Sequence, residues 1–325
     1  MKNFFIKKLT EFASQDPDVI LLTADLGFSH FEAFINKFPN QYFNVGIAEQ
    51  NMIGVAAGLA LSGKKVFVYS IASFTTARCF EQIKLDLCYH NLKVIIMGGG
   101  AGFSYSKSGA THQAFEDIGI MRTLPNMSIL CPADISELDA CLGYAINNEG
   151  PAYIRLSNEN RNLHNNKVND VNIRFPIKVF DNGKASKALK GSKALILTTG
   201  NTLALGMDVA KELSSEKDIN LALYTVPLIK PYDKDSILHL LSNYNFIFTI
   251  EEHVSEGGFG SLISEILAED ANMNPFFKKF YLKNPFVKKV GSQDFIRQLA
   301  GLSKEMIKKD ICDVILTNLA KRDAV

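Results

Sequence analysis

The spacing of hydrophobic residues in the first half of the chain alternates between two periods. Residues 3–14 place apolar side chains at helical spacing, and residues 19–22 form a short apolar run typical of a buried strand. The same alternation predicts further strands at 42–47, 66–69, 94–97 and 153–156 and further helices at 51–62, 77–89 and 136–147. Helical segments between short, β-branched strands indicate a parallel sheet that is covered on both faces.

A second unit of the same kind follows a polar segment. Residues 161–191 are rich in Asn, Lys, Asp and Gly and lack a sustained helical period, so we expect a linker there. Beyond it, the pattern predicts strands at 194–199, 221–226 and 246–251 and helices at 202–213 and 259–268. We therefore predict two doubly wound α/β domains: residues 1–160, with a mostly parallel sheet, and a smaller domain at residues 192–325.

Composition and charge exclude several classes of function. The 325 residues are 47% hydrophobic and 21% charged, which is ordinary for a soluble globular protein. The 35 Lys and Arg residues balance 34 Asp and Glu residues without a long run of one sign. Bulk electrostatics therefore gives no support for binding to nucleic acid or to an anionic membrane.

The cysteines and the apolar runs bear on location. The five cysteines contain no Cys-x-x-Cys pair, so we expect buried thiols in a reducing compartment. Lys7 and Lys8 interrupt the apolar start of the chain, and a signal peptide is not expected. The longest apolar run, Ile53–Leu61, is far too short to span a bilayer. A cytoplasmic protein is the expectation.

A carboxylate, Glu49, lies where a predicted strand meets an Ala- and Gly-rich helix. In parallel α/β folds that junction faces the ligand crevice. A glutamate at a helix start is equally explained by the helix dipole, so its position alone does not establish a function.

Aromatic and imidazole side chains follow the next two strands. Phe74 and Phe80 could stack on a planar ring or simply fill the core. His112 lies in a loop after the glycine-rich segment 98–102, where it could exchange protons near neutral pH or be a surface residue. The glycines do not match a dinucleotide-binding fingerprint, which excludes a nicotinamide site.

Taken together and in order, these segments resemble the C-terminal section of transketolase over nearly the whole chain. Deoxyxylulose-phosphate synthases and the β subunits of 2-oxoacid dehydrogenases share parts of the pattern. The segments that carry the resemblance are Thr23-Ala24-Asp25-Leu26, Val45-Gly46-Ile47-Ala48-Glu49-Gln50, Ala72-Ser73-Phe74, Gly109-Ala110-Thr111-His112-Gln113, Leu124-Pro125-Asn126, Cys131-Pro132-Ala133-Asp134, Glu251-Glu252-His253 and Gly257-Gly258-Phe259-Gly260.

The resemblance implies thiamine diphosphate as the cofactor and assigns roles to residues. Glu49 would bond the ring nitrogen of the aminopyrimidine and activate the cofactor, and His112 would stabilise charge and relay protons at the substrate. Glu49, Phe74, Phe80 and Asp25 are then the cofactor-binding residues, and Ser29, Ser108, His112 and Gln113 the substrate residues. Glu252 and His253 are expected to have a structural role at a subunit interface.

The family's motif for magnesium and diphosphate, Gly-Asp-Gly followed by an Asn pair, does not occur in this sequence. We therefore expect no metal ligands here. The resemblance implies that an N-terminal-half subunit carries the diphosphate and Mg²⁺ (or Ca²⁺) site and completes an α2β2 heterotetramer.

Several positions depart from the family pattern. Ser108 replaces an Asp that contacts a donor hydroxyl, Gly100 replaces a His associated with sugar phosphate, and Asn158 replaces a phosphate-binding Arg. Arg155 or Arg161 could compensate. We expect a donor or acceptor other than the standard pentose phosphates, such as an unphosphorylated or nucleotide-linked sugar, or pyruvate as an acyl donor.

Two further readings stay open. The chain could be the β subunit of a decarboxylating 2-oxoacid dehydrogenase, although the Gly-Ala-Thr-His-Gln segment favours the sugar-converting enzymes. It could also be a partner-binding homologue without activity, although Glu49, Phe74 and His112 occurring together speak against that.

Overall fold

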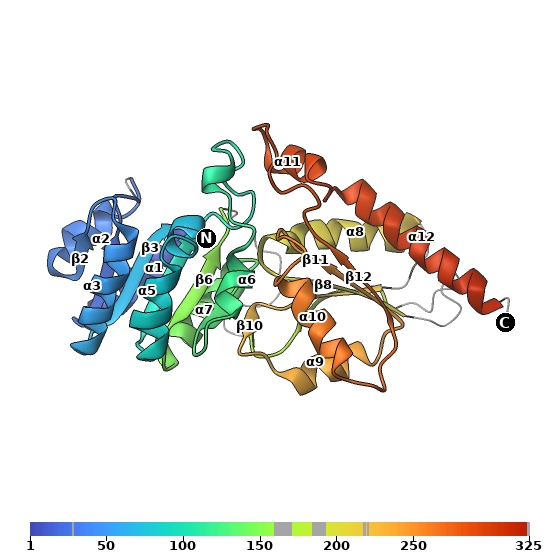
Figure 1. Ribbon diagram of the computed structural model, residues 1–325, viewed down its shortest axis with the longest axis horizontal. Coiled ribbons are helices and arrows are strands. Elements are labelled where there is room, and N and C mark those ends of the chain that lie inside the picture. The colour runs from blue at the N-terminus through green and yellow to red at the C-terminus, as the bar shows by residue number, and fades with distance from the viewer. Residues whose placement is uncertain (28, 159–170, 184–192, 217–218, 220, 324–325) are drawn as a thin grey trace.

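Two mostly parallel sheets organise the computed structural model, which describes all residues except 28, 159–170, 184–192, 217–218, 220 and 324–325 (Figure 1). Within these residues, the first sheet has the order β10-β5-β6-β4-β3-β1-β2, and all pairs except β10 with β5 are parallel. Its strands are β1 (Val19–Thr23), β2 (Tyr42–Asn44), β3 (Lys65–Ile71), β4 (Val94–Gly99), β5 (Ser128–Leu130), β6 (Ala152–Leu156) and β10 (Leu228–Lys230).

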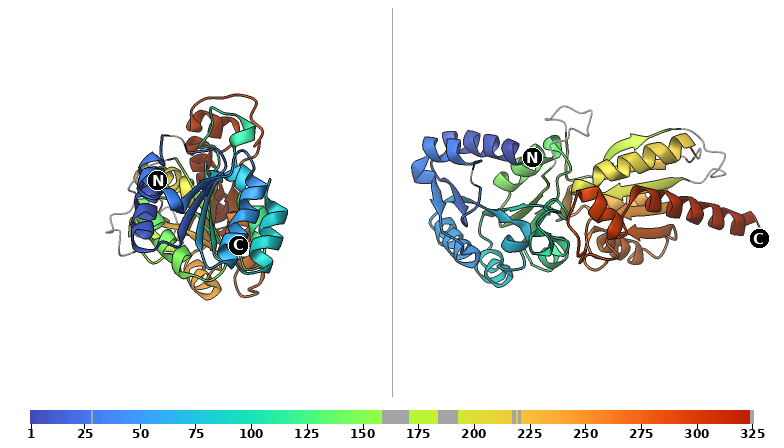
Figure 2. Two further views of the ribbon diagram at one scale, coloured as in Figure 1. Left: turned by 90° about the vertical axis from the view of Figure 1, so that its left-hand side faces the viewer. Right: turned by 90° about the horizontal axis from the view of Figure 1, so that it is seen from above.

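Helices cover both faces of this sheet, as Figure 2 shows in its end view. Alternation along β1 sends Ile20 and Leu22 to one face and Val19 and Leu21 to the other, and both faces are buried. The helical segments are α1 (Lys2–Gln15), α2 (Glu32–Lys37), α3 (Glu49–Leu61), α4 (Ala72–Thr75), α5 (Phe80–Gln82), the π-helical η2 (Ile83–Tyr89), η3 (Ala110–His112), α6 (Asp117–Arg122) and α7 (Ile135–Asn147).

The second sheet has the order β12-β11-β8-β9-β7, with only β7 antiparallel to its neighbour. The strands are β7 (Ile177–Asp181), β8 (Ala194–Thr198), β9 (Leu221–Thr225), β11 (Phe246–Ile250) and β12 (Phe276–Phe280). Its helices are α8 (Leu203–Glu216), α9 (Lys234–Leu241), α10 (Phe259–Ala268), α11 (Gln293–Leu299) and α12 (Lys304–Asp323). The predicted fold class, two doubly wound α/β units with mostly parallel sheets, is confirmed.

Several elements differ from the sequence-based expectation, which also did not include β5, β12, α2, α6, α9, α11 and α12. Strand β7 lies inside the predicted linker 161–191, because Val179 and Phe180 pack on the second core while β7 pairs with β9. Strand β10 comes from the second half of the chain but extends the first sheet, where Leu228 is buried. The helix predicted over 77–89 begins at Phe80 and continues as a π-helix from Ile83.

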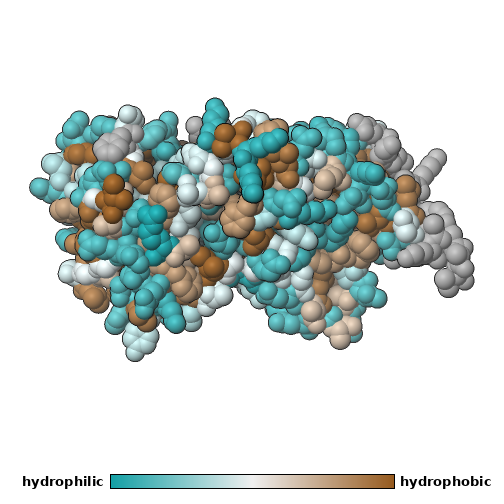
Figure 3. All heavy atoms as spheres, turned by 45° about the horizontal axis from the view of Figure 1, so that its top comes forward, coloured by the Kyte–Doolittle hydropathy of each residue, from teal (hydrophilic) through white to brown (hydrophobic). Residues whose placement is uncertain are grey.

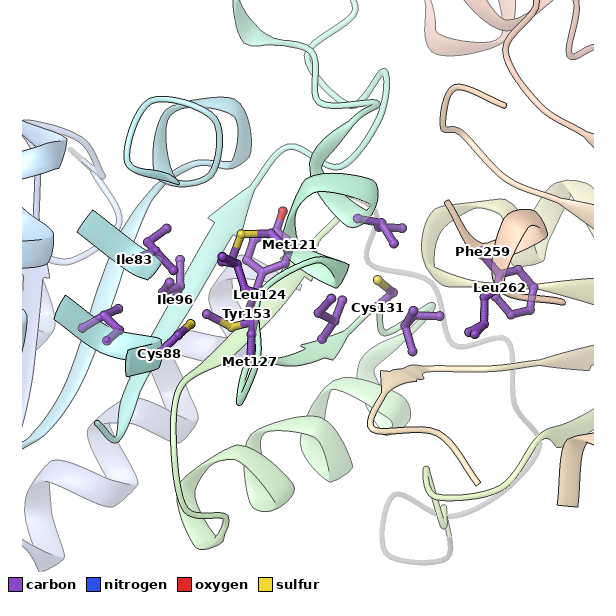
Figure 4. Packing of buried hydrophobic residues seen from close by; sticks show 14 of the residues in the cluster. Ile83, Cys88, Ile96, Met121, Leu124, Met127, Cys131, Tyr153, Phe259 and Leu262 are labelled. Carbon is purple, nitrogen blue, oxygen red and sulfur yellow. The ribbon is translucent and has the colours of Figure 1, made fainter. Parts of the chain in front are cut away.

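The hydrophobic cores of the two halves meet. One buried cluster includes Ile83 and Ile96 of the first half, Cys131, and Phe259 and Leu262 of α10 in the second (Figure 4). The five cysteines are free thiols, four of them buried and Cys312 half-buried, and burial raises the pKa of Cys79 to about 12 and that of Cys88 to about 11. In the described part of the chain, every helix is too short or too polar to cross a bilayer.

A buried ion pair lies at the junction of the halves. Arg155 Nε is 2.7 Å from Asp117 Oδ2, which also accepts a 2.6 Å hydrogen bond from the Tyr153 hydroxyl. The second guanidinium nitrogen, Nη2, donates to the carbonyls of Ala114 and Glu252 at 2.8 and 3.1 Å. Burial alone would lower the pKa of Arg155, but the charge of Asp117, its hydrogen bond and the neighbouring Cys131 and Tyr153 together raise that pKa, so Arg155 stays charged.

Removing the cation should strongly destabilise the fold, because Asp117 would remain buried with a charge that only Tyr153 compensates. We expect Arg155→Leu to lower the free energy of unfolding by about 3–5 kcal/mol, measured by urea denaturation. Lys234→Ala, which breaks the exposed pair with Glu269, is the control and should leave the midpoint unchanged. A loss no larger than that of the control would contradict a stabilising role for the buried pair.

Candidate active site

Four loops converge at the carboxyl edge of the first sheet. Because β2, β1, β3 and β4 are neighbours and run parallel, their C-terminal ends lie side by side. Asp25 follows β1, Glu49 follows β2, Phe74 follows β3 and His112 follows β4. Topology thus brings together four of the predicted site residues that are far apart in the sequence.

Glu49 is the first residue of α3, and its side chain is only 4% exposed. Its Oε2 lies 2.8 Å from Nη1 of Arg78. The Arg78 guanidinium carbon also lies 4.2 Å from the centre of the Phe74 ring, within range of a cation–π contact. Arg78 therefore joins Glu49 and Phe74 at the mouth of the site, with 44% of its side chain exposed.

His112 lies against the other side of Phe74. The two ring centres are 5.4 Å apart in an edge-on arrangement, and Tyr105 approaches His112 in the same manner at 6.4 Å. The Thr111 hydroxyl is 2.8 Å from His112 Nδ1, and Ser73 Oγ donates to the Thr111 carbonyl at 3.3 Å. These contacts orient the imidazole, and none of them involves its second ring nitrogen, Nε2.

Gln113 and Asp25 complete the lining in different ways. Gln113 is buried, and neither its amide oxygen nor its nitrogen has a hydrogen-bond partner among the described residues. Such orphaned groups are costly, so a ligand that bonds them would be favoured. Asp25 adopts a positive φ of 53°, and its amide and carboxylate both bond the Asn44 side chain, at 2.9 and 3.3 Å.

Other predicted residues lie outside this cluster. Phe80 is half-buried and packs against the core below α3, while Ser29 and Ser108 are exposed on their loops. Arg155 is only 2% exposed and fully engaged at the domain junction, so the expectation that it could replace the phosphate-binding arginine is wrong. Arg161 lies outside the described residues.

A cavity of about 280 Å³ lies next to the loop that carries His112, lined by Met1, Lys2, Asn3, His30 and Asn158. The Asn158 amide donates to the Ser104 carbonyl at 3.3 Å, and Lys2 lies over the Tyr69 ring. Burial lowers the pKa of Lys2, and burial together with the Lys2 charge lowers that of His30. Cationic and amide groups therefore meet in a small space beside the candidate site.

Glu251, Glu252 and His253 are buried directly after β11 and hold backbone groups in place. Glu251 accepts the amides of Phe259 and Gly260 at 2.7 and 2.8 Å, and burial raises its pKa. His253 Nε2 accepts the Gly119 amide at 3.1 Å. The contacts of Glu252 and His253 join the two domains of one chain, whereas the sequence suggested a subunit interface.

The described arrangement offers a buried carboxylate beside an aromatic ring, with an imidazole and an unpartnered amide a short distance away. A planar, nitrogen-containing ring fits such a pocket, since it can pack on Phe74 and bond Glu49. In the described residues, only Arg78 bonds the Glu49 carboxylate, through Oε2, so Oε1 is available for a second donor.

Comparison with known families gives two matches that together cover most of the chain. Residues 1–162 match the pyrimidine binding domain of transketolase, and residues 183–307 match the transketolase C-terminal domain.

Several curated proteins are similar over most of their own length. The chain is 34% identical to one subunit of the apulose-4-phosphate transketolase of Actinobacillus succinogenes, over 83% of this chain and 84% of that one. It is 31% identical to the SqwH subunit of the 6-deoxy-6-sulfo-D-fructose transketolase of Clostridium sp. strain MSTE9, over 95% and 92%. It is 30% identical to a putative transketolase C-terminal section of Methanocaldococcus jannaschii, over 96% and 95%.

Solved structures agree with these matches. A split-gene transketolase in an inactive β4 tetramer superposes with a TM-score of 0.82 and 29% identity, covering 97% of both chains. Transketolase of Pichia stipitis has a TM-score of 0.75 at 16% identity and shares the fold; the match covers 98% of this chain but 46% of that one. A sequence relative shows the same partial coverage. The 1-deoxy-D-xylulose-5-phosphate synthase of Clostridium perfringens is 31% identical, and the match covers 96% of this chain but 48% of the synthase.

Proposed function

This chain belongs to the transketolase family, and we propose that it is the C-terminal-half subunit of a split, thiamine-diphosphate-dependent transketolase that moves a two-carbon unit between sugars. The observation that carries the proposal is the buried Glu49 carboxylate beside Phe74, at the edge of the sheet where β1 to β4 end. The similar proteins from A. succinogenes and Clostridium are named as transketolase subunits, which favours a transketolase over the β subunit of a 2-oxoacid dehydrogenase.

Glu49 would bond the aminopyrimidine ring, and Phe74 would pack against its face. When bound, thiamine diphosphate supplies the carbon nucleophile that accepts and releases the two-carbon unit. The task of Glu49 is to hold a proton at the pyrimidine nitrogen in a site largely closed to water. Arg78 pairs with the Glu49 carboxylate and lies over the Phe74 ring, so it would orient both groups toward the cofactor.

His112 would act on the substrate. In the tautomer in which the Thr111 hydroxyl donates to Nδ1, the ring proton is on Nε2, which would donate to a substrate oxygen as charge develops there. Phe74 and Tyr105 fix the ring on two sides, so the imidazole is oriented before a substrate binds.

A partner subunit would hold the diphosphate and its Mg²⁺ or Ca²⁺ ion and form an α2β2 assembly with this chain. The support is twofold. The sequence contains no Gly-Asp-Gly motif, and complete relatives such as the C. perfringens synthase are about twice as long as the matched region. Free, buried thiols support a reducing, cytoplasmic setting.

An exposed apolar face beside the site fits such a partner. Ile47 is 80% exposed only two residues before Glu49, and Val55 and Leu61 are exposed on the outer face of α3. Gly54 and Gly58 lie on the same helix face, with open space where a side chain would be. Each glycine costs the helix about 1 kcal/mol relative to alanine, a cost that close approach of a partner would offset. Figure 3 shows hydrophobic residues interrupting the hydrophilic surface of this domain, on the left.

The cavity beside the site favours a substrate with an anionic end. Lys2, His30 and Asn158 line it, and all three can donate to phosphate or sulfonate oxygens. The relatives named for apulose 4-phosphate and for sulfofructose have substrates of this charge. We therefore propose a phosphorylated or sulfonated sugar, in place of the unphosphorylated sugar, nucleotide-linked sugar or pyruvate that the missing arginine suggested.

The Glu49 assignment is tested with Glu49→Gln. It should fold normally, since Arg78 is half-exposed, yet lower kcat of the assembled enzyme by about 100- to 10,000-fold, measured with the partner and a ketose donor. Glu81→Gln, at an exposed position on α5, is the matched control and should keep full activity. Near-normal turnover of Glu49→Gln would overturn the assignment.

Association is tested with Ile47→Asp. A charge placed in a buried interface costs several kcal/mol, so partner binding should weaken by more than about 100-fold in sedimentation or calorimetry. The melting temperature of the isolated chain should not change. Leu316→Asp, at an exposed apolar position of α12, is the control and should bind normally. Normal partner binding by Ile47→Asp would exclude this face.

The anion site is tested with Lys2→Met and His30→Gln. Each should raise KM for a phosphorylated donor about ten-fold, the effect of losing one charge-assisted contact, whereas the exposed control Lys107→Met should not. The lowered pKa leaves His30 mostly neutral at neutral pH. A bound anion would raise that pKa, so the His30 imidazole would take up a proton when the anion binds.

Affinity for the anionic donor should therefore increase as the pH falls from about 8 to about 6, and His30→Gln should remove this increase. Equal or better turnover of a donor without phosphate or sulfonate would contradict the assignment.

A further inference from the structure

The loop that carries His112 is attached to the second domain as well as to its own. It leaves the first sheet after β4 and returns at Ala114, where Gly102 and Ala114 exchange backbone hydrogen bonds of 2.9 and 3.3 Å. The phenylalanines at its two ends, Phe103 and Phe115, are buried in the core cluster of the second domain, together with Ile196, Phe248 and Ile250. The ends of the loop are thus part of a core that begins some eighty residues later in the chain.

Glu252 is the polar centre of this attachment. Its Oε2 accepts the Phe103 amide at 2.8 Å and the Asn201 amide group at 2.6 Å, and its Oε1 pairs with Arg297. Gln293 donates to the same carboxylate at 3.1 Å. A buried carboxylate with this many directed donors has a single low-energy position, so it fixes the backbone group that it binds.

The chain next to Phe103 is shaped to accept the Glu252 carboxylate. Gly102 has a positive φ of 54°, and a Cβ there would lie 2.0 Å from Glu252 Oε2. The absence of a side chain at this position therefore lets the carboxylate reach the loop backbone.

Further contacts fix the loop along its length. The Ser106 hydroxyl donates to the Gly291 carbonyl at 2.8 Å, and the Phe115 carbonyl accepts the Val254 amide at 2.8 Å. In Figure 1 the loop, drawn in green at the top of the first domain, faces the red segment that leads into α11, and both views of the two segments agree (Figure 2). Residues of the first domain also bond the loop: Ser73 and Asn158 donate to the Thr111 and Ser104 carbonyls at 3.3 Å, and Arg155 donates to the Ala114 carbonyl at 2.8 Å.

We propose that the second domain positions the catalytic loop and that Glu252 is the positioning residue through which it acts. This rests on the proposed function, in which His112 acts on the substrate. The second domain is then part of the catalytic apparatus, although it contributes no group to the reacting atoms. A displacement of His112 by about 1 Å would be enough to cost roughly 100-fold in rate.

The first test uses Glu252→Gln in the full-length chain assembled with its partner. The expected result is a kcat lower by about 10- to 100-fold with an unchanged KM and unchanged cofactor affinity. Hydrogen exchange of the amides of 103–114 should accelerate, while exchange in α3, which holds Glu49, should remain as in the wild type. An unchanged kcat, or acceleration spread evenly over the chain, would overturn the proposal.

A second pair of variants covers the case in which Glu252→Gln does not fold, since Arg297 would lose the charge of its buried partner and keep only the exposed Asp294 as a charged partner among the contacts described. Ser106→Ala removes a bond to the second domain, whereas Ser104→Ala removes a 2.6 Å bond to Ala101 within the loop itself. Ser106→Ala should accelerate exchange of 105–112 about five-fold, as expected from the loss of one neutral hydrogen bond, and Ser104→Ala should not. Equal effects of the two variants would overturn the proposal.

The exchange measurement also separates this proposal from the proposed function. An assembled wild-type enzyme that lacks transketolase activity would contradict the function and leave the exchange result intact. Activity with no loop-specific change in either Glu252→Gln or Ser106→Ala would contradict the positioning role alone.

Discussion

Parallel pairing of β2, β1, β3 and β4 is the constraint on which the candidate site depends. In a parallel sheet each connection must run back to the opposite edge before the next strand begins. All four strands therefore end at the same edge, and the loops that follow them lie together there. Glu49, Phe74 and His112 belong to different loops, but the pairing of four short strands decides that they meet. The buried, apolar faces of these strands supply the free energy that keeps the loops in register.

The buried carboxylates divide into two groups by the donors around them. Glu251, Glu252 and Asp117 each accept two or more directed bonds from buried groups, and they serve to hold backbone and domains together. Glu49 is as deeply buried but pairs with one half-exposed arginine. A carboxylate that is removed from water yet incompletely bonded is the kind that can take part in chemistry.

Much of the fold could be predicted from the sequence, because alternating helical and strand periods are local signals. The strands at 19–22, 66–69 and 194–199 and the helix at 259–268 closely match β1, β3, β8 and α10. Strands β5, β7, β10 and β12 were missed. Of these, β7, β10 and β12 are short edge strands, which are defined by partners that lie far away in the chain. The site residues came from resemblance to the family, and their roles stay predictions. Arg78 and Tyr105 could not be foreseen, since nothing local marks a side chain that folds back onto another loop.

The attachment of the His112 loop to the second domain bears on where such an enzyme can be divided between two genes. A division between the two domains of this chain would put Phe103 and Glu252 on separate polypeptides, and a 2.8 Å contact in a dry core would then have to form at every assembly. A division ahead of the first domain keeps the loop and its support in one translation product. These contacts therefore oppose a division within this unit, and the relatives that span nearly the same length keep both domains on one chain.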